Sequence, residues 1–395
     1  MKKFISVLLA VCLTYVFLIS GFAGLKNDAK LKFNGDGKFK IFVLADVQDD
    51  YPIEKAEIAF IEAALDKEQP DVVVFDGDNI VTSDVRAYEQ LLAPLVKRNI
   101  PFTFVFGNHD DESSVLNKEE MLAEYQKYAG CLAYDADPSL HGCATHNLPV
   151  LSSDGSRVAF NLWLMDSGDY VFDANGNGLG YDWVRADQIK WYQNTRDSLK
   201  AENGGELVPS MMFQHIIPKE ACEKIFYKSY IPLGDITMNF NDGTYLTFLP
   251  DITSFSGLLF ERSCPGCGSD GQWQAIVEGG DVLGVVVGHD HVNGFVADVD
   301  GVDLIQTAGA TYNSYSNSFL QGGRIIEVDE NKPFEYTTYN VTTAELVSEG
   351  HTEISDADPE KTEAAYRFDF IFGKILDVFM NVLRYVLGDM FSITK

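Results

Sequence analysis

Short apolar runs that are rich in β-branched and aromatic residues recur along the first 290 residues, and amphipathic stretches of helical length separate them. We expect strands at 40–45, 71–75, 101–106, 158–165, 208–214 and 282–287. We expect helices at 53–68, 85–98, 117–129 and 185–200. Strands that alternate with helices are typical of an α/β fold, so the pattern predicts a layered α/β body.

The pattern changes after residue 291, where the apolar runs are shorter and no helical stretches separate them. Further strands are expected near 293–297, 302–307, 322–328 and 335–341. Strands that follow one another without crossover helices usually pair antiparallel. This part of the chain is therefore predicted to close the body with antiparallel strands.

The N-terminal segment, residues 1–24, has two lysines followed by an uncharged, mainly apolar stretch at 4–23. This pattern is typical of a signal peptide or of an uncleaved N-terminal anchor. The small residues around Ala23 suit cleavage, whereas the apolar stretch exceeds the usual ~7 to 15 residues of a signal core. Both alternatives predict an extracytoplasmic protein, either secreted or membrane-anchored.

The C-terminal part has two segments of different character. Residues 351–365 are polar and acidic, which predicts a linker, whereas 366–395 has the pattern of an amphipathic helix. Its polar or small residues recur every three or four positions, at Asp369, Gly373, Asp377, Asn381, Arg384 and Gly388. The wide apolar face between them could pack on the body, pack on another subunit, or lie in a membrane surface.

Charge restricts the class of partner. The chain has 59 acidic and 30 basic residues, for a net charge of -29. Such a charge repels nucleic acid and anionic headgroups at long range. No nucleic-acid binding is expected, and membrane association through 4–23 or 366–395 would not depend on attraction to anionic lipid.

Polar residues with metal-binding chemistry follow five of the predicted strands. They are Asp46 and Gln48, then Asp76-Gly77-Asp78-Asn79, then Gly107-Asn108-His109-Asp110, then His215, and finally Gly288-His289-Asp290-His291. A lone histidine is more often a hydrogen-bonded structural residue, but ligands in open α/β sheets bind beyond the carboxyl ends of strands. Carboxylate, amide and imidazole donors together suit divalent Mn, Zn, Fe, Co or Ni.

This ordered series resembles the calcineurin-like metallophosphoesterase superfamily over roughly residues 38–330. The stretches 164–170 (LMDSGDY), 213–220 (FQHIIPKE) and 288–293 (GHDHVN) are similar to the branch that includes fungal phosphatases and plant probable inactive purple acid phosphatases. The resemblance implies an α-β-β-α sandwich for a catalytic domain at 38–345. It also implies phosphoester hydrolysis at a dinuclear metal centre, with a metal-bound hydroxide as nucleophile.

The resemblance also assigns roles to individual residues. Asp46, Asp78 and His291 would hold one metal ion, and Asp78 would bridge to the second. Asn108, His215 and His289 would complete the second site, and Gly288 would permit the sharp turn that aims the two histidines at different ions. His109 would act beside the metals as a catalytic residue, with Asp110 orienting its ring.

Two positions depart from the family pattern. Gln48 stands where many members have a histidine; its amide oxygen could coordinate a metal or hold a water ligand, but it is a weaker donor than imidazole. Val81 stands where purple enzymes have a tyrosine, so no tyrosinate-to-iron colour is expected. A catalytically impaired relative, acting as a metal-binding protein or a membrane-attached scaffold, is therefore the alternative to a phosphohydrolase.

Overall fold

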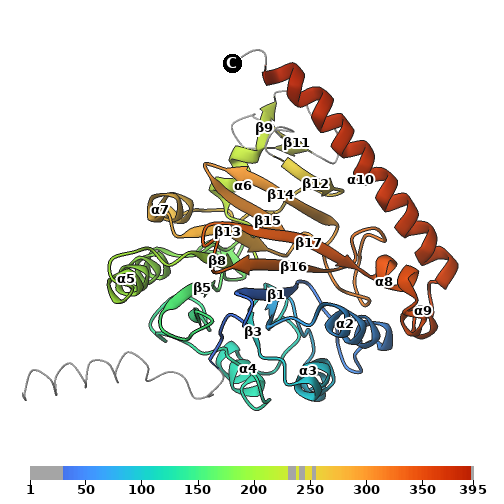
Figure 1. Ribbon diagram of the computed structural model, residues 1–395, viewed down its shortest axis with the longest axis horizontal. Helices are drawn as coiled ribbons and strands as arrows, with labels where there is room; N and C mark the ends of the chain where they lie inside the picture. The colour runs from blue at the N-terminus through green and yellow to red at the C-terminus, as the bar shows by residue number, and fades with distance from the viewer. Residues whose placement is uncertain (1–29, 230–236, 240–244, 251–254, 393–395) are drawn as a thin grey trace, which may run out of the picture.

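The computed structural model describes residues 30–229, 237–239, 245–250 and 255–392 (Figure 1). The predicted N-terminal signal or anchor lies outside these residues. Among the described helices, none combines the length and the apolar character needed to cross a membrane.

Two β-sheets form the centre of the fold. The first consists, in spatial order, of β17 (Tyr336–Thr342), β16 (Gly322–Asp329), β1 (Lys38–Leu44), β2 (Val72–Asp76) and β3 (Phe102–Val105). The second consists of β12 (Phe255–Leu259), β14 (Asn293–Val299), β15 (Val302–Gln306), β13 (Val282–Val287), β8 (Ser210–Phe213), β5 (Val158–Leu164) and β4 (His146–Leu151). The strands β1, β2 and β3 run parallel, as do β5, β8, β13 and β15.

Alternating side chains of the strands reach two different cores. In β1, Ile41 and Val43 pack in a core shared with the second sheet, whereas Phe42 and Leu44 pack in a core shared with helices. In β13, Val286 faces the first sheet, and its neighbours in sequence face the opposite way. Strands that are buried on both faces need continuous apolar runs, which explains the three consecutive valines at 285–287.

Helices cover the outer faces of the two sheets (Figure 1). The first sheet packs against α2 (Lys55–Glu68), α3 (Arg86–Arg98), α4 (Lys118–Tyr125) and α8 (Thr343–Glu349). The second packs against α5 (Ala186–Glu202), α6 (Lys219–Ile225) and α7 (Gln272–Gly279). The predicted α-β-β-α sandwich is therefore confirmed.

Two smaller sheets are added to this sandwich. A hairpin is formed by β6 (Tyr170–Phe172) and β7 (Gly178–Tyr181), and a three-stranded sheet is formed by β10 (Thr237–Asn239), β11 (Tyr245–Pro250) and β9 (Phe226–Ser229). The hairpin matters for function because it follows β5 and returns toward the carboxyl ends of the central strands.

The C-terminal helix, α10 (Glu363–Ser392), runs along one side of the molecule (Figure 1). Leu376 and Met380 of this helix pack against Leu258, Ala308 and Leu320 of the body. The segment expected to be an acidic linker contains a short helix, α9 (Thr352–Ala357), and α10 already begins within it. The linker forms a helix because Ile354 supplies a fully buried apolar anchor in an otherwise polar sequence.

Candidate metal centre

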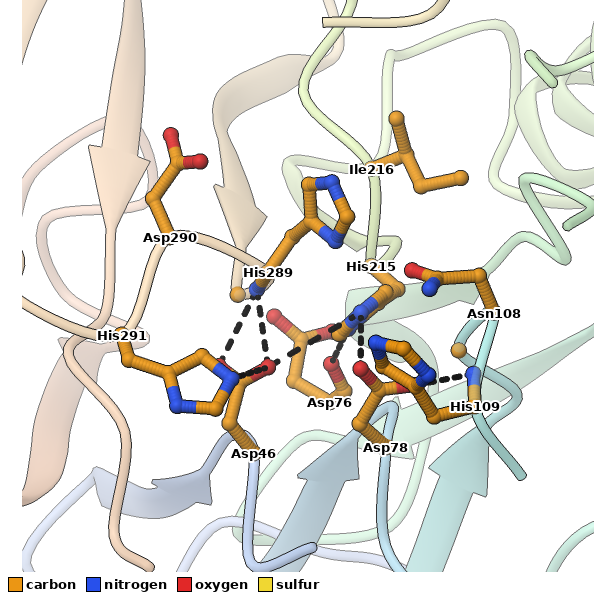
Figure 2. A network of polar contacts seen from close by, with 12 residues as sticks. Asp46, Asp76, Asp78, Asn108, His109, His215, Ile216, His289, Asp290 and His291 are labelled. Carbon is orange, nitrogen blue, oxygen red and sulfur yellow. Dashed lines mark hydrogen bonds and ion pairs between the residues drawn. The ribbon is translucent and has the colours of Figure 1, made fainter. Parts of the chain in front are cut away.

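The predicted site residues come together between the carboxyl ends of the two sheets (Figure 2). Asp46 and Gln48 follow β1, Asp78 follows β2, and Asn108 and His109 follow β3. The second sheet contributes His215 after β8 and His289 and His291 after β13. Asp290, between the two histidines, points away from the cluster, and its Oδ1 accepts a hydrogen bond from the Cys264 N–H at 3.1 Å (Figure 2).

The loops that carry these residues have an uncommon backbone conformation. Positive φ angles occur at Asp46 (50°), Gln48 (45°), Asp78 (50°) and His289 (73°). Such angles are unfavourable for residues other than glycine and persist only where surrounding contacts enforce them. Hydrogen bonds between the loops supply those contacts, since the Gln48 N–H donates to the Asp78 carbonyl at 2.7 Å.

Glycines beside the site are required for space. A Cβ at Gly107 would lie 2.2 Å from Asp78 Oδ1, and a Cβ at Gly288 would lie 2.9 Å from Asp46 Oδ2. A glycine is therefore required at position 288, as expected, but not because it adopts the conformation of the sharp turn. The left-handed residue of that turn is His289, and Gly288 is needed because the loop passes close to Asp46.

The ligand atoms form two groups that share one residue. In the first group, atoms of Asp78, His215 and His289 all lie within 4.8 Å of one another, and in the second the same holds for Asp46, Asp78 and His291. The distance from His215 Nε2 to Asp78 Oδ2 is 3.1 Å, and that from His291 Nε2 to Asp46 Oδ1 is 3.5 Å (Figure 2). Asp78 is thus placed where a bridging carboxylate would have to be.

Backbone carbonyl groups orient two of the histidine rings. The Nδ1 of His215 lies 2.9 Å from the Asp76 carbonyl, and the Nδ1 of His291 lies 2.9 Å from the Tyr315 carbonyl. A carbonyl can only accept a hydrogen bond, so each Nδ1 carries the proton. Once Nε2 is deprotonated, its lone pair faces the carboxylates, which is the arrangement found in metal-binding histidines.

Several buried polar atoms at this centre have no hydrogen-bond partner. They are Gln48 Oε1, Asn108 Oδ1 and His289 Nε2, whereas Asp78 Oδ2 and His215 Nε2 have no partner other than each other. Each buried polar atom left without a partner costs about 1–3 kcal/mol. The unpaired atoms are oxygens and imidazole nitrogens, the donors that divalent Mn, Zn, Fe, Co or Ni bind, so the residues present fit such ions.

The electrostatics of the cluster also favour a positive charge. Burial lowers the pKa of His215, but the neighbouring carboxylates of Asp78 and Asp46 outweigh this effect and raise that pKa to about 10. Burial and the positive His215 lower the pKa of His289 to about 3. The protein therefore retains a positive charge between these carboxylates, at a place that a cation would suit.

The predicted role of Asp110 is wrong. Its carboxylate does not reach the His109 ring, whose Nδ1 lies 2.6 Å from Glu112 Oε2. Asp110 is buried, and its two oxygens accept hydrogen bonds from the backbone N–H groups of Gly107, Asp78, Asn79 and Ile80 at 2.7–3.2 Å. It fixes the loop after β2 to the loop after β3 and so positions Asp78.

Two aromatic residues around the centre, Tyr170 and Tyr181, were not predicted. The Tyr170 hydroxyl accepts a hydrogen bond from Asn108 Nδ2 at 2.8 Å, which leaves Asn108 Oδ1 available to a ligand. The Tyr181 ring meets the His289 ring edge-on at 4.3 Å, and the Tyr315 ring stacks on the His291 ring at 4.2 Å. Tyr170 ends the 164–170 stretch, which was the one sequence signal that could have indicated a role.

Asp76 was found in the series of strand-end residues, but no role was predicted for it. Asp76 is fully buried at the end of β2, and neither of its oxygens has a hydrogen-bond partner. Burial raises its pKa well above the usual range. Its position directly after four apolar residues, at 72–75, was the available signal.

Comparison with known proteins agrees with this geometry. Residues 39–293 match the family model for the calcineurin-like phosphoesterase. The chain is 29% identical over 334 residues to "Probable inactive purple acid phosphatase 14" of Arabidopsis thaliana, covering 77% of this chain and 78% of that protein. It is 30% identical over 213 residues to "Phosphatase DCR2" of Saccharomyces cerevisiae, covering 47% of this chain and 36% of that protein.

Solved structures were compared as well. A dimetal phosphatase from Danio rerio superposes with a TM-score of 0.42 and 13% identity, covering 76% of this chain and 98% of that one. The family model itself spans more than half of the chain. The chain therefore belongs to the calcineurin-like phosphoesterase family.

Proposed function

We propose that this protein is an exported, metal-dependent phosphohydrolase that cleaves phosphoesters at a dinuclear metal centre. The observation that carries the proposal is the set of buried, unpartnered donor atoms that converge around Asp78. One ion would be held by Asp46, Asp78 and His291, with Gln48 beside them. The other would be held by Asp78, Asn108, His215 and His289.

Two divalent ions bound there would make a water molecule nucleophilic at neutral pH and would neutralise charge on the phosphoryl oxygens. One backbone hydrogen bond fixes the orientation of the Asp78 carboxylate. The His109 N–H donates to Asp78 Oδ1 at 2.7 Å, whereas Oδ2 faces His215 Nε2 at 3.1 Å and accepts no backbone hydrogen bond.

His109 is the residue best placed to handle a proton. Its side chain is 34% exposed, in contrast to the buried ligand candidates, so a substrate can reach it. Glu112 contacts Nδ1 at 2.6 Å and thereby holds the ring in one orientation. When the ring is doubly protonated, Nε2 would donate its proton to the departing oxygen of the substrate, and the ring would remain neutral with its proton on Nδ1.

The proposal is tested by replacing the shared carboxylate. In the full chain with added Mn²⁺ or Zn²⁺, Asp78→Asn should reduce hydrolysis of an aryl phosphate at least hundredfold, because it removes a ligand common to both ions. Asp197→Asn, which changes an exposed aspartate paired with Arg196, should have no effect. Equal activity of the Asp78→Asn variant and the parent would refute the bridging role.

The second candidate function is a metal-binding protein without catalysis. Gln48 supports it, because an amide is a weaker ligand than imidazole, and so does the word "inactive" in the name of the Arabidopsis relative. Metal analysis together with a panel of phosphomonoesters and phosphodiesters separates the candidates. Bound metal with no turnover of any ester would favour the binding protein.

The proposal that the protein is exported depends only on the sequence of residues 1–24. If these residues direct export, the full chain should be found outside the cytoplasm, and a chain that lacks them should remain inside. Retention of the anchor would leave the exported protein with the membrane fraction, whereas cleavage near Ala23 would release it. Cytoplasmic recovery of the full chain would contradict this part of the proposal.

A further inference from the structure

The C-terminal helix exposes an apolar surface that its packing on the body leaves uncovered. Tyr366, Leu376 and Met380 supply contacts with the body. Seven other large apolar residues are 43–66% exposed, namely Phe368, Ile371, Phe372, Ile375, Val378, Phe379 and Val382. We call these seven residues the apolar face of α10.

The apolar face is continuous and uncharged. At about 100° per residue, its seven members fall within an arc of about 120° around the helix axis. Along residues 363–383, whose side chains the structure describes, the charged residues all lie outside that arc. These are Glu363, Arg367, Asp369, Lys374 and Asp377.

The apolar face extends beyond the helix toward the metal centre. The Phe372 ring lies 5.2 Å from the Phe319 ring, which lies 6.3 Å from the ring of Phe260. The next residue, Glu261, accepts a hydrogen bond from the Tyr315 hydroxyl at 3.1 Å, and Tyr315 stacks on His291. A partner bound on this surface would therefore lie beside one edge of the site.

We propose that the apolar face of α10, together with Phe319 and Phe260, seats the protein on the surface of a neutral lipid bilayer. Amphipathic helices bind bilayers with an apolar face in the acyl boundary and with polar residues facing water, and exposed phenylalanines suit that boundary. The helix would lie in the plane of the membrane.

Charge and hydrogen bonding favour lipid over a protein partner. A second copy of the chain would bring another 29 negative charges close to the first, and an anionic bilayer would be repelled in the same way. Interfaces between proteins also carry about ten hydrogen bonds, whereas the seven side chains of this face offer no donor or acceptor. A neutral bilayer requires neither opposite charge nor hydrogen bonds.

The test places a fluorescent reporter on each side of the helix in the full chain. Phosphatidylcholine vesicles with brominated acyl chains should quench the added fluorescence of a Phe379→Trp chain at least threefold more than that of a Lys374→Trp chain. The signal of the parent, which has four tryptophans, is subtracted. This readout reports whether the helix itself is seated, whatever residues 4–23 do.

A matched pair of variants tests the surface itself. In the Phe379→Trp chain, adding Ile371→Asp and Ile375→Asp should reduce quenching to the level of the Lys374→Trp chain. Adding Lys374→Asp instead makes the same change of net charge outside the apolar face and should leave quenching intact. Circular dichroism checks that α10 remains folded in every variant.

Three results would overturn the proposal. The first is equal quenching of the two reporters, which would show that the helix does not lie in the bilayer. The second is quenching that requires anionic lipid. The third is a dimer, seen by light scattering without lipid, that Ile371→Asp and Ile375→Asp dissociate, because a second copy would then be the occupant of this face.

Discussion

Close packing leaves no space for a side chain at some positions beside the metal centre, and Gly107 is one of them. The φ angle of Gly107 is not in the left-handed region, yet a Cβ there would lie 2.2 Å from Asp78 Oδ1 and 2.4 Å from the Asp78 nitrogen. We expect Gly107→Ala to displace Asp78 and to weaken metal binding more than tenfold, measured by metal titration. Gly35→Ala is the matched control, because a Cβ at Gly35 would meet nothing within 4 Å. Equal affinities would contradict the assigned position of Asp78.

A buried histidine away from the metal centre should make stability depend on pH. Burial lowers the pKa of His146 to about 4, and its ring lies 2.8 Å from Thr103 Oγ1 and 2.6 Å from the Ala144 carbonyl. In the unfolded chain its pKa is about 6.5. As the pH falls from 6.5 toward 4, the unfolded chain binds a proton that the folded protein does not, and stability is lost.

The effect of His146 can be isolated by substitution. Between pH 7 and pH 5, the free energy of unfolding of the parent should fall by about 2 kcal/mol more than that of a His146→Gln variant. Chemical denaturation at the two pH values measures this difference, and the contributions of all other groups cancel in the comparison. A parent and a variant with the same pH dependence would show that His146 is not held neutral.

Sequence reasoning at the residue scale found the ligand candidates because they follow strands directly. It misassigned Asp110, since a carboxylate next to a histidine in sequence points to the opposite side of the loop, toward the backbone N–H groups of Asp78 and Asn79. It missed Tyr181, because nothing in the sequence of the β6–β7 hairpin indicates that the hairpin folds back onto His289.

At the scale of elements, apolar runs predicted β1, β2, β3, β5, β8 and β13, because strands buried on both faces consist mainly of apolar residues. β4 was not predicted. It contains Pro149 and is the last strand of its sheet, where its outer side bonds to residues 31–33 only at Leu151, and an edge strand tolerates a proline at a position that needs no N–H donor. Short helices such as α6 and α9 were also missed, since one or two turns give too few positions for a helical pattern.

One predicted helix has a terminus that can be tested. α4 begins after Asn117, whose side chain accepts a hydrogen bond from the Glu120 N–H at 2.8 Å, while Glu120 bonds back to the Asn117 N–H. Removing this reciprocal cap with Asn117→Ala should lower the free energy of unfolding by about 1 kcal/mol. Asn331→Ala, at an exposed turn between β16 and β17, is the comparison for a change outside a helix cap. No loss of stability at Asn117 would contradict the capping role.

At the scale of the whole molecule, the centre exists only because two sheets pack face to face. Asp46 and Asp78 come from the first sheet and His215, His289 and His291 from the second, so the donor atoms converge only in the folded chain. The order of the motifs predicted this convergence through the resemblance to a family. Sequence alone could not place α10, because its pattern shows an apolar face without showing which side the body covers.

The most direct test of the dinuclear centre is the number of divalent metal ions bound to the purified full chain, measured by elemental analysis after equilibration with Mn²⁺ or Zn²⁺. We expect about two ions per chain in the parent and fewer than one in Asp78→Asn, because this residue belongs to both groups of ligand atoms. A parent chain that binds no metal, or an Asp78→Asn chain that binds as much as the parent, would contradict the dinuclear centre.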